Sequence, residues 1–289
     1  MKRKIQLLII DPQNDFCDLP ESHRPVDPLT GQRVAPALPV AGAHADLQRL
    51  AQLLRETTAA YTDIAITLDS HNRLHIAHPT FWQGGDGGDV AAFTSITAQQ
   101  VRAGQYRPRD DRARPRALAY LDALEARGRY QLMIWPVHCE IGSFGHNVHA
   151  DVRAAYNAWE TQQLRVVTKV AKGSNLWTEH YSALQAEVPD QSDPHTLLNH
   201  ALLAALDPAD LLLIAGEASS HCVKATSEDI VANLPSGRPE RLVLLTDCMS
   251  PVAGFGAQHD AFLADMRARG VGLATTADVM PELQANARR

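Results

Sequence analysis

The sequence predicts an α/β domain built on a doubly wound, Rossmann-like sheet that is mainly parallel and has about six strands flanked by helices. Apolar runs rich in β-branched residues recur along the chain, and helical patterns separate them. The runs are unbroken, which is typical of strands buried on both faces of a parallel sheet. The expected strands are residues 4–10, 63–68, 130–135, 165–170, 210–216, 241–247 and 271–275.

The helical patterns follow the 3.6-residue period. In residues 41–59 the period places four leucines on one face: Leu47, Leu50, Leu53 and Leu54. We expect further helices at 144–159, 195–206, 220–234 and 258–270. Because strands and helices alternate along the whole chain, we predict one domain spanning residues 1–289 rather than two independent ones.

Two stretches interrupt the alternation and are interpreted as insertions. Residues 18–40 contain five prolines and predict a long ordered loop. Residues 83–129 begin with QGGDGGD and contain two helix-like runs, at about 90–103 and 115–127. Segments of this length in compact domains serve as lids, interfaces or disordered regions. The arginines of the second insertion either meet an anionic substrate or form a solvated charged loop; they are Arg107, Arg109, Arg112 and Arg114.

The composition argues against a nucleic-acid-binding, disulfide-rich or membrane-spanning protein. The formal charge is −6, and no block rich in Lys and Arg is present, so we expect no nucleic-acid partner. Four cysteines without a CxxC pair do not form a disulfide framework. No apolar run reaches the roughly 18 residues that a membrane helix needs, and the apolar start ends early at Asp11-Pro12. We expect a cytoplasmic protein that binds a small molecule, and a homo-oligomer is left open.

Polar residues follow several expected strands, where ligands bind in doubly wound sheets. Asp11 directly follows the first strand, although an Asp before Pro12 can also be a simple turn residue. Lys169 and Lys172 lie where the fourth strand ends, and a surface lysine is the ordinary alternative for each. Asp11 and one of these lysines are therefore candidates for one site.

A second group has the donor types of a metal site. Asp69 and His71 are two residues apart, so in an extended chain their side chains point the same way. His138 follows the third expected strand, and His75 and His78 add nearby nitrogen atoms. Two histidines and one carboxylate from neighbouring strand ends suit a divalent transition metal with open positions. The alternative is a set of polar turn residues.

Cys222 lies in the turn between the fifth strand and the following helix. A helix N-terminus carries partial positive charge, which lowers the pKa of a thiol and favours the thiolate. The backbone N–H groups of such a turn can also stabilise an oxyanion. The alternative is a small buried apolar residue, which we expect for Cys17, Cys139 and Cys248.

Together these motifs resemble the isochorismatase-like cysteine hydrolases, and among them the nicotinamidases and pyrazinamidases. DPQNDF, DSHNRLH, WPVHC, KGSN followed by HYSAL, and GEASSHCV occur in the family's order between about residues 4 and 275. The resemblance implies a catalytic triad of Asp11, Lys172 and Cys222. Lys172 is favoured over Lys169 because the family's lysine precedes a motif matched here by Tyr181-Ser182-Ala183.

The same resemblance assigns the remaining site residues. It implies metal ligands at Asp69, His71 and His138, with His75 as a further histidine that some members use. It implies an oxyanion hole formed by the N–H groups of Ala218 and Cys222, with a cis peptide between Glu217 and Ala218. The residues that it implies for substrate binding are Phe16, Trp135, Tyr181 and His221.

The implied reaction is hydrolysis of nicotinamide to nicotinate and ammonia through a Cys222 thioester, as a step in NAD salvage. The implied metal is one divalent ion, with zinc favoured over iron and manganese, and it orients the substrate. Another amide or ureido substrate is the main competing hypothesis, because the stretch between Asp69 and His138 is much longer than in compact nicotinamidases. Two further hypotheses are a metal-centred enzyme in which Cys222 is structural and a non-catalytic binding protein.

Overall fold

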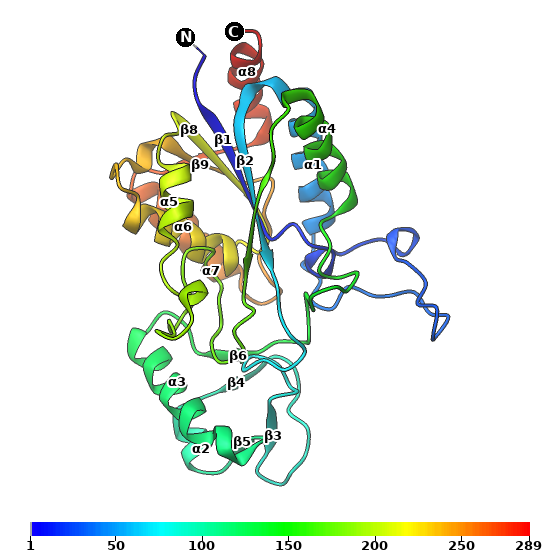
Figure 1. Ribbon diagram of the computed structural model, residues 1–289, viewed down its shortest axis with the longest axis vertical. Helices are drawn as coiled ribbons and strands as arrows, with labels where there is room; N and C mark the ends of the chain where they lie inside the picture. The colour runs from blue at the N-terminus through cyan, green and yellow to red at the C-terminus, as the bar shows by residue number, and fades with distance from the viewer. Residues whose placement is uncertain (1) are drawn as a thin grey trace.

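The computed structural model describes residues 2–289, and within that range its main sheet has six strands, all parallel (Figure 1). Their spatial order is β10-β9-β8-β1-β2-β7. The strands are β1 (Ile5–Ile10), β2 (Tyr61–Asp69), β7 (Thr168–Lys172), β8 (Leu211–Gly216), β9 (Leu242–Leu245) and β10 (Gly272–Ala274). This arrangement confirms the predicted fold class.

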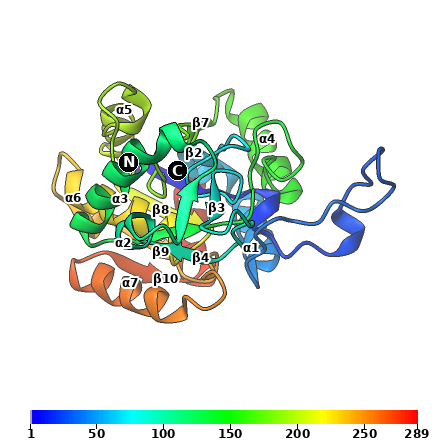
Figure 2. The ribbon, with the colours of Figure 1, turned by 90° about the horizontal axis from the view of Figure 1, so that it is seen from below.

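Helices cover both faces of the sheet (Figures 1 and 2). One face carries α1 (Ala43–Glu56), α4 (Ala150–Gln163) and α8 (Thr276–Ala287), and the other carries α5 (His200–Leu206), α6 (Cys222–Asn233) and α7 (Gly256–Ala268). Every residue of the central strands β1 and β8 is buried, which explains their unbroken apolar sequences. The four leucines expected on one face of α1 are buried as well. Within residues 2–289 no helix has the length and apolar character needed to cross a membrane.

One predicted strand belongs to a different sheet. The run at 130–135 yields β6 (Leu132–Ile134), which pairs antiparallel with β4 (Thr94–Ile96) outside the main sheet. The prediction was wrong because an apolar run shows that a segment is buried but not which partner buries it. The neighbour of β2 is β7, and it starts three residues later than the predicted 165–170. The helix predicted at 144–159 starts at Ala150, after an irregular segment.

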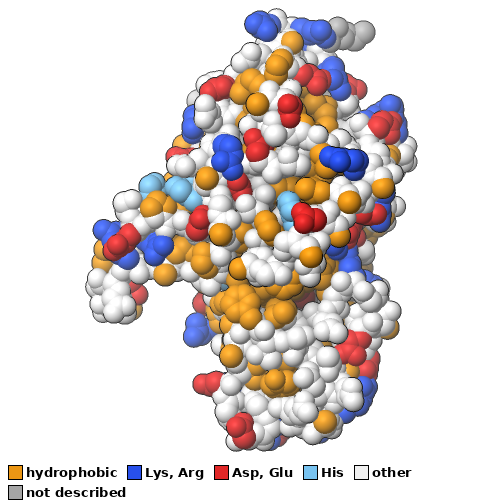
Figure 3. Space-filling view, turned by 180° about the vertical axis from the view of Figure 1, so that it is seen from behind, with side chains coloured by type: hydrophobic (Ala, Val, Ile, Leu, Met, Phe, Trp, Pro, Cys, Tyr) orange, Lys and Arg blue, Asp and Glu red, His pale blue; other side chains and the backbone are white. Residues whose placement is uncertain are grey.

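The 83–129 region is ordered and lies beyond the carboxyl ends of the main strands (Figure 1). It contains β4, α2 (Ala98–Arg102), β5 (Tyr106–Pro108) and α3 (Arg114–Arg127), and β5 pairs with β3 (Trp82–Gly84). On the face shown in Figure 3, hydrophobic side chains gather where this region meets the main body, and basic and acidic side chains are interspersed. The region therefore lies on the side of the sheet where ligand sites are found.

The 18–40 region is mostly irregular and projects from the body (Figures 1 and 2). Its one short helix is the 3₁₀ turn η2 (Glu21–His23). The other 3₁₀ turns are η1 (Asn14–Phe16), η3 (Thr58–Ala60), η4 (Asp111–Ala113), η5 (Pro194–Thr196) and η6 (Pro239–Arg241).

Candidate active site

The structure brings Asp11, Lys172 and Cys222 together at the carboxyl end of the sheet. The Nζ atom of Lys172 lies 2.9 Å from Oδ2 of Asp11 and 3.6 Å from Sγ of Cys222. Asp11 follows β1, Lys172 is the last residue of β7, and Cys222 is the first residue of α6. The three side chains are buried. Three separate sequence motifs therefore form one cluster of a nucleophile, a carboxylate and an ammonium group.

The end of β8 must pass very close to β1 to place Cys222 there. Gly216 has φ +117°, and a Cβ atom at this position would lie 1.9 Å from the carbonyl oxygen of Ile10. Glycine is therefore required at this position. The next peptide, Glu217–Ala218, is cis, as predicted. Within residues 2–289, the backbone N–H groups of Ala218 and Cys222 have no hydrogen-bond acceptor, so both can donate to a ligand oxygen.

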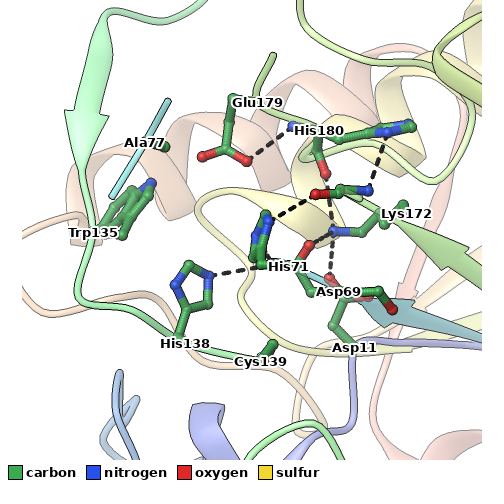
Figure 4. A network of polar contacts seen from close by, with 12 residues as sticks. Asp11, Asp69, His71, Ala77, Trp135, His138, Cys139, Lys172, Glu179 and His180 are labelled. Atoms are coloured by element: carbon green, nitrogen blue, oxygen red, sulfur yellow. Dashed lines mark hydrogen bonds and ion pairs between the residues drawn. The ribbon is translucent and has the colours of Figure 1, made fainter. Parts of the chain in front are cut away.

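Lys172 is held by four groups. Besides Asp11 and Cys222, its Nζ contacts Oδ1 of Asp69 at 3.1 Å and the carbonyl oxygen of His180 at 3.0 Å (Figure 4). Burial alone would lower the pKa of Lys172, but the two carboxylates hold that pKa well above its usual value. Lys172 is therefore an ammonium group that fixes the position of Asp11.

Asp11 also accepts a hydrogen bond from the hydroxyl of Thr67, at 2.5 Å between Oγ1 and Oδ1. Burial raises the pKa of the Asp11 carboxyl above its usual value, against the opposing effect of Lys172. A higher pKa makes the carboxylate a stronger proton acceptor. Its carboxylate and the Cys222 thiol belong to one group whose ligand atoms lie within 4.8 Å of one another, close enough for proton transfer with small movements.

The resting form of Cys222 differs from the prediction. The helix N-terminus was expected to favour the thiolate, but burial raises the pKa of this thiol well above its usual value, and Asp11 and Asp69 raise it further. Lys172 opposes them without reversing the direction. The prediction was wrong because it counted the helix terminus and left out the loss of hydration. Cys222 therefore needs a base, and Asp11 is placed to act as one.

Asp69, His71 and His138 converge on a point suited to a metal ion. The Nε2 atoms of His71 and His138 lie 3.1 and 3.3 Å from the same oxygen, Oδ2 of Asp69 (Figure 4). Each Nδ1 contacts a carbonyl oxygen, of Gly173 at 2.9 Å and of Pro136 at 2.8 Å. With Nδ1 donating, each Nε2 directs a lone pair toward the carboxylate, and a cation between them removes the repulsion. The donor set therefore fits a divalent metal ion.

The additional histidines differ in what their ring nitrogens contact. His75 contacts the carbonyl oxygen of Thr178 through Nε2 at 3.1 Å, and its Nδ1 accepts the N–H of Ala77 at 3.2 Å. Both nitrogens of His75 thus have backbone partners, although His75 also forms, with His71 and His78, a second group whose ligand atoms lie within 4.8 Å of one another. His78 uses Nδ1 toward the carbonyl of Arg73, while its buried Nε2 has no partner within the described residues.

Gly173 packs directly against two of these ligands, which leads to a testable prediction. A Cβ atom at Gly173 would lie 2.8 Å from the His71 ring and 2.9 Å from Oδ1 of Asp69, and φ is +88°. We expect Gly173→Ala to displace both ligands and to weaken the binding of a divalent metal ion by about tenfold or more, as loss of an outer-shell partner does. Competition with a chromogenic chelator measures the affinity. Gly254→Ala, at a positive φ with no atom within 4 Å of its Cβ position, is the control; equal affinities in both variants would contradict the prediction.

An aromatic pocket adjoins the thiol and the metal ligands. It is lined by Phe16, Leu38, Asp69, Trp135, His138, Glu179, Tyr181, Ala218, His221, Cys222 and Val252. The indole N–H of Trp135 donates to the hydroxyl of Tyr181 at 3.0 Å, which fixes the orientation of both rings. All four residues expected to bind substrate therefore line this pocket, within reach of the nucleophile.

The 83–129 region supports the pocket without placing its arginines there. Phe93 contacts Trp135 edge-on, with ring centroids 5.9 Å apart, and the hydroxyl of Tyr120 accepts the N–H of Glu179 at 3.2 Å. Arg109 forms an ion pair with the exposed side chain of Asp89, and Arg112 forms one with Asp110. Neither they nor Arg107 and Arg114 line the pocket. Of the two alternatives for these arginines, the ion pairs of Arg109 and Arg112 favour the solvated charged loop.

Comparison with known proteins identifies the fold. No protein-family model matches the sequence, and no curated protein matches it. Among solved structures, an Acinetobacter baumanii nicotinamidase/pyrazinamidase aligns over 96% of this chain and 98% of its own, with 18% identity and a TM-score of 0.60. The yeast nicotinamidase Pnc1p bound to the inhibitor nicotinaldehyde aligns over 94% and 99%, with 18% identity and a TM-score of 0.58. The zinc complex of Pyrococcus horikoshii pyrazinamidase aligns over 94% and 99%, with 16% identity and a TM-score of 0.50.

The chain has the isochorismatase-like fold. Identities this low establish the fold alone.

Within this isochorismatase-like fold, three site residues were not predicted from the sequence. Thr67 contacts Asp11, the carbonyl of His180 accepts from Lys172, and Glu179 lines the pocket. Thr67 lies two residues before Asp69 on β2, so strand alternation could have placed it on the same side. Glu179 and His180 directly precede Tyr181, but backbone carbonyls and loop carboxylates carry no periodic signal.

A buried glutamate close to the candidate site makes stability depend on pH. Burial raises the pKa of Glu187 to about 7, against the opposing effect of Arg129, which lies 4.0 Å away. Because the folded-state pKa exceeds the usual 4.5, the contribution of Glu187 to stability is complete below pH 4.5 and is lost as the pH rises through about 7.

We therefore expect Glu187→Gln to gain stability relative to the unmodified protein between about pH 5 and pH 8, by up to about 3 kcal/mol. Urea unfolding of both proteins at the two pH values measures this difference. A difference that stays constant with pH would show that Glu187 titrates normally.

Proposed function

We propose that the protein is a cysteine amidohydrolase of the isochorismatase-like family that hydrolyses nicotinamide to nicotinate and ammonia, and so supplies nicotinate to NAD salvage. The observation that carries this proposal is the convergence of Asp11, Lys172 and Cys222 beside an aromatic pocket and a metal-binding group. The names of the solved structures that share the fold support the substrate.

The geometry supports a two-step reaction. Asp11 takes the thiol proton as Sγ of Cys222 attacks the carboxamide carbon, and the N–H groups of Ala218 and Cys222 stabilise the oxyanion, an effect worth about 2.7–4 kcal/mol per donor. The C–N bond breaks, Asp11 returns the proton to the leaving ammonia, and a thioester remains. Asp11 then deprotonates a water molecule that cleaves the thioester to give the carboxylic acid and the free thiol.

Lys172 acts in both steps without transferring a proton. Its ammonium group lies between the Asp11 carboxylate and the Cys222 sulfur, so it stabilises the negative charge as that charge moves from one to the other. The contacts with Asp69 and with the carbonyl of His180 prevent Lys172 from moving away.

The pocket is suited to a flat heteroaromatic amide. Phe16 and Trp135 provide apolar surfaces for stacking, while Tyr181 and His221 supply polar groups at the wall. Burial lowers the pKa of His221 to about 4, so the ring is neutral at physiological pH. The hydroxyl of Ser220 contacts Nδ1 of His221 at 2.9 Å and also accepts the N–H of Val252, so Nε2 is the ring nitrogen left to contact a ligand.

Asp69, His71 and His138 would hold one divalent metal ion, and we propose zinc, which is bound in the pyrazinamidase of the same fold. When bound, the ion supplies a Lewis-acidic contact that orients the ring of the substrate. Iron and manganese suit the same donors.

The metal assignment predicts a change in binding. We expect His138→Ala to weaken zinc affinity by at least about 100-fold, because it removes one of three ligands. Isothermal titration with zinc measures the affinity. His146→Ala is the control, since this neighbouring histidine contacts Ser70 and belongs to no metal-competent group of residues 2–289. Equal zinc affinities for the two variants would contradict the assignment.

A substrate panel tests the proposed reaction. Zinc-loaded protein is incubated with nicotinamide, larger aromatic amides and N-carbamoyl acids, and ammonia release is measured for each. We expect the highest kcat/KM for nicotinamide. A higher value for an N-carbamoyl acid or a larger amide would replace the substrate assignment and retain the cysteine hydrolase.

A further inference from the structure

Glu179 contributes an unpaired carboxyl oxygen to the pocket. The side chain is only 4% exposed and lines the same cavity as Trp135 and His138. Its Oε1 accepts the N–H of His180 at 2.9 Å, whereas Oε2 is buried and has no partner within residues 2–289. In Figure 4 the free oxygen points away from His180, toward the side on which Trp135 lies.

The position of Glu179 is fixed by its neighbours. Its backbone N–H donates to the hydroxyl of Tyr120 on α3, and its carbonyl accepts from the N–H of Glu187 at 2.8 Å. Oε1 is held as well, so three hydrogen bonds fix the residue in this position. The 83–129 region, through Tyr120, therefore helps to hold Glu179 at the pocket wall.

A buried acceptor without a partner costs free energy, because its hydrogen bonds to water are lost on burial and not replaced. Glu179 belongs to none of the metal-competent groups found among residues 2–289, so its free oxygen is available to a ligand. A ligand that donates an N–H to Oε2 removes the cost. A ligand that brings a carboxylate to the same place adds repulsion.

The pocket wall also lacks a basic side chain that could pair with the free oxygen of Glu179. Within residues 2–289 no Lys or Arg lines it. Lys172 lies behind it and already contacts Asp11, Asp69 and a carbonyl oxygen. No Lys or Arg side chain at the pocket wall is therefore available to pair with Oε2 of Glu179.

We propose that Glu179 is a specificity-determining residue: it accepts a hydrogen bond from an amino or N–H substituent on the ring of an aromatic amide, and it selects against amides that carry a carboxylate. This inference rests on the proposed function and deepens it. The substrate class is neutral or donor-bearing aromatic amides, and ureido acids are excluded.

The test measures binding without turnover. Zinc-loaded Cys222→Ala protein is titrated by calorimetry with nicotinamide, an amino-substituted nicotinamide and a carboxy-substituted nicotinamide. We expect the amino compound to bind at least about tenfold more tightly than the carboxy compound, the size of one hydrogen bond to a charged group. Adding Glu179→Gln should reduce this ratio by about tenfold. Glu187→Gln is the matched control, since Glu187 is also a buried glutamate with an unpartnered oxygen but does not line the pocket; it should leave the ratio unchanged.

An unchanged ratio in Glu179→Gln, an equal change in Glu187→Gln, tighter binding of the carboxy compound, or no binding of any of the three would overturn the inference. The proposed function fails separately: selective binding with no ammonia release from any amide by the protein with Cys222 intact would reject the reaction and leave the selectivity in place.

Discussion

Replacing Cys222 with alanine is expected to reduce amide hydrolysis by at least about 10⁴-fold, because loss of the nucleophile leaves only binding and oxyanion stabilisation. The fold should remain intact, since Cys222 is small and lies at the first position of α6. The measurement is ammonia release under saturating nicotinamide, together with a circular dichroism spectrum.

Cys248→Ala is the matched control for that experiment. Cys248 is also a free, fully buried thiol, but it does not line the pocket. Its loss should leave kcat within about twofold, because it contacts no reacting group. Activity that survives in Cys222→Ala but disappears on chelation would indicate a metal-centred enzyme in which the thiol is structural.

Replacing Lys172 with methionine is expected to abolish activity and to lower the free energy of unfolding. Lys172 is the cation shared by two buried carboxylates, Asp11 and Asp69. Removing one partner of a buried ion pair leaves uncompensated charge and costs about 3–5 kcal/mol. Urea unfolding of the metal-free protein measures the loss directly, since no bound ion then compensates the charge.

Lys169→Met controls for the general effect of losing a lysine. Lys169 lies on the same strand, but it is exposed. Its Nζ is as far as 3.9 Å from Oε1 of its partner Glu160, so the ion pair is weak. We expect little change in stability or activity. If both variants behaved alike, the buried charge cluster would not be the source of the effect.

The sequence allowed the main site residues to be predicted because strand ends of a parallel sheet meet at one edge. Asp11, Asp69 and Lys172 each follow an apolar run, so their convergence required only the correct fold class. His138 reaches the same place although its strand, β6, lies outside the main sheet. A turn held by the contact between its Nδ1 and the carbonyl of Pro136 directs the ring toward Asp69.

The electrostatics of the site could not be predicted in the same way. The pKa of Cys222 depends on how deeply the thiol is buried and on two carboxylates from other strands, which are properties of the packed structure. The free lone pairs of the histidines depend on backbone carbonyls, and a sequence pattern does not place these. The same holds for Glu179, whose importance comes from a missing partner rather than from a motif.

The role of the 83–129 region also needed the structure. Its length indicated a lid, an interface or a disordered segment, and its arginines left open either a contact with an anionic substrate or a solvated charged loop. The structure pairs Arg109 and Arg112 with neighbouring acidic residues, as in a charged loop, and places Tyr120 and Phe93 where they support the pocket. Which face of an insertion meets the active site is decided by packing between distant segments.

Turnover of nicotinamide by the zinc-loaded protein shows whether the reaction depends on Cys222. Zinc-loaded protein is incubated with nicotinamide, and nicotinate and ammonia are quantified over time. We expect the two products to appear in equal amounts, and we expect their formation to stop when Cys222 is alkylated. No product from the zinc-loaded protein, or undiminished formation after alkylation of Cys222, would contradict a Cys222-dependent nicotinamide hydrolase.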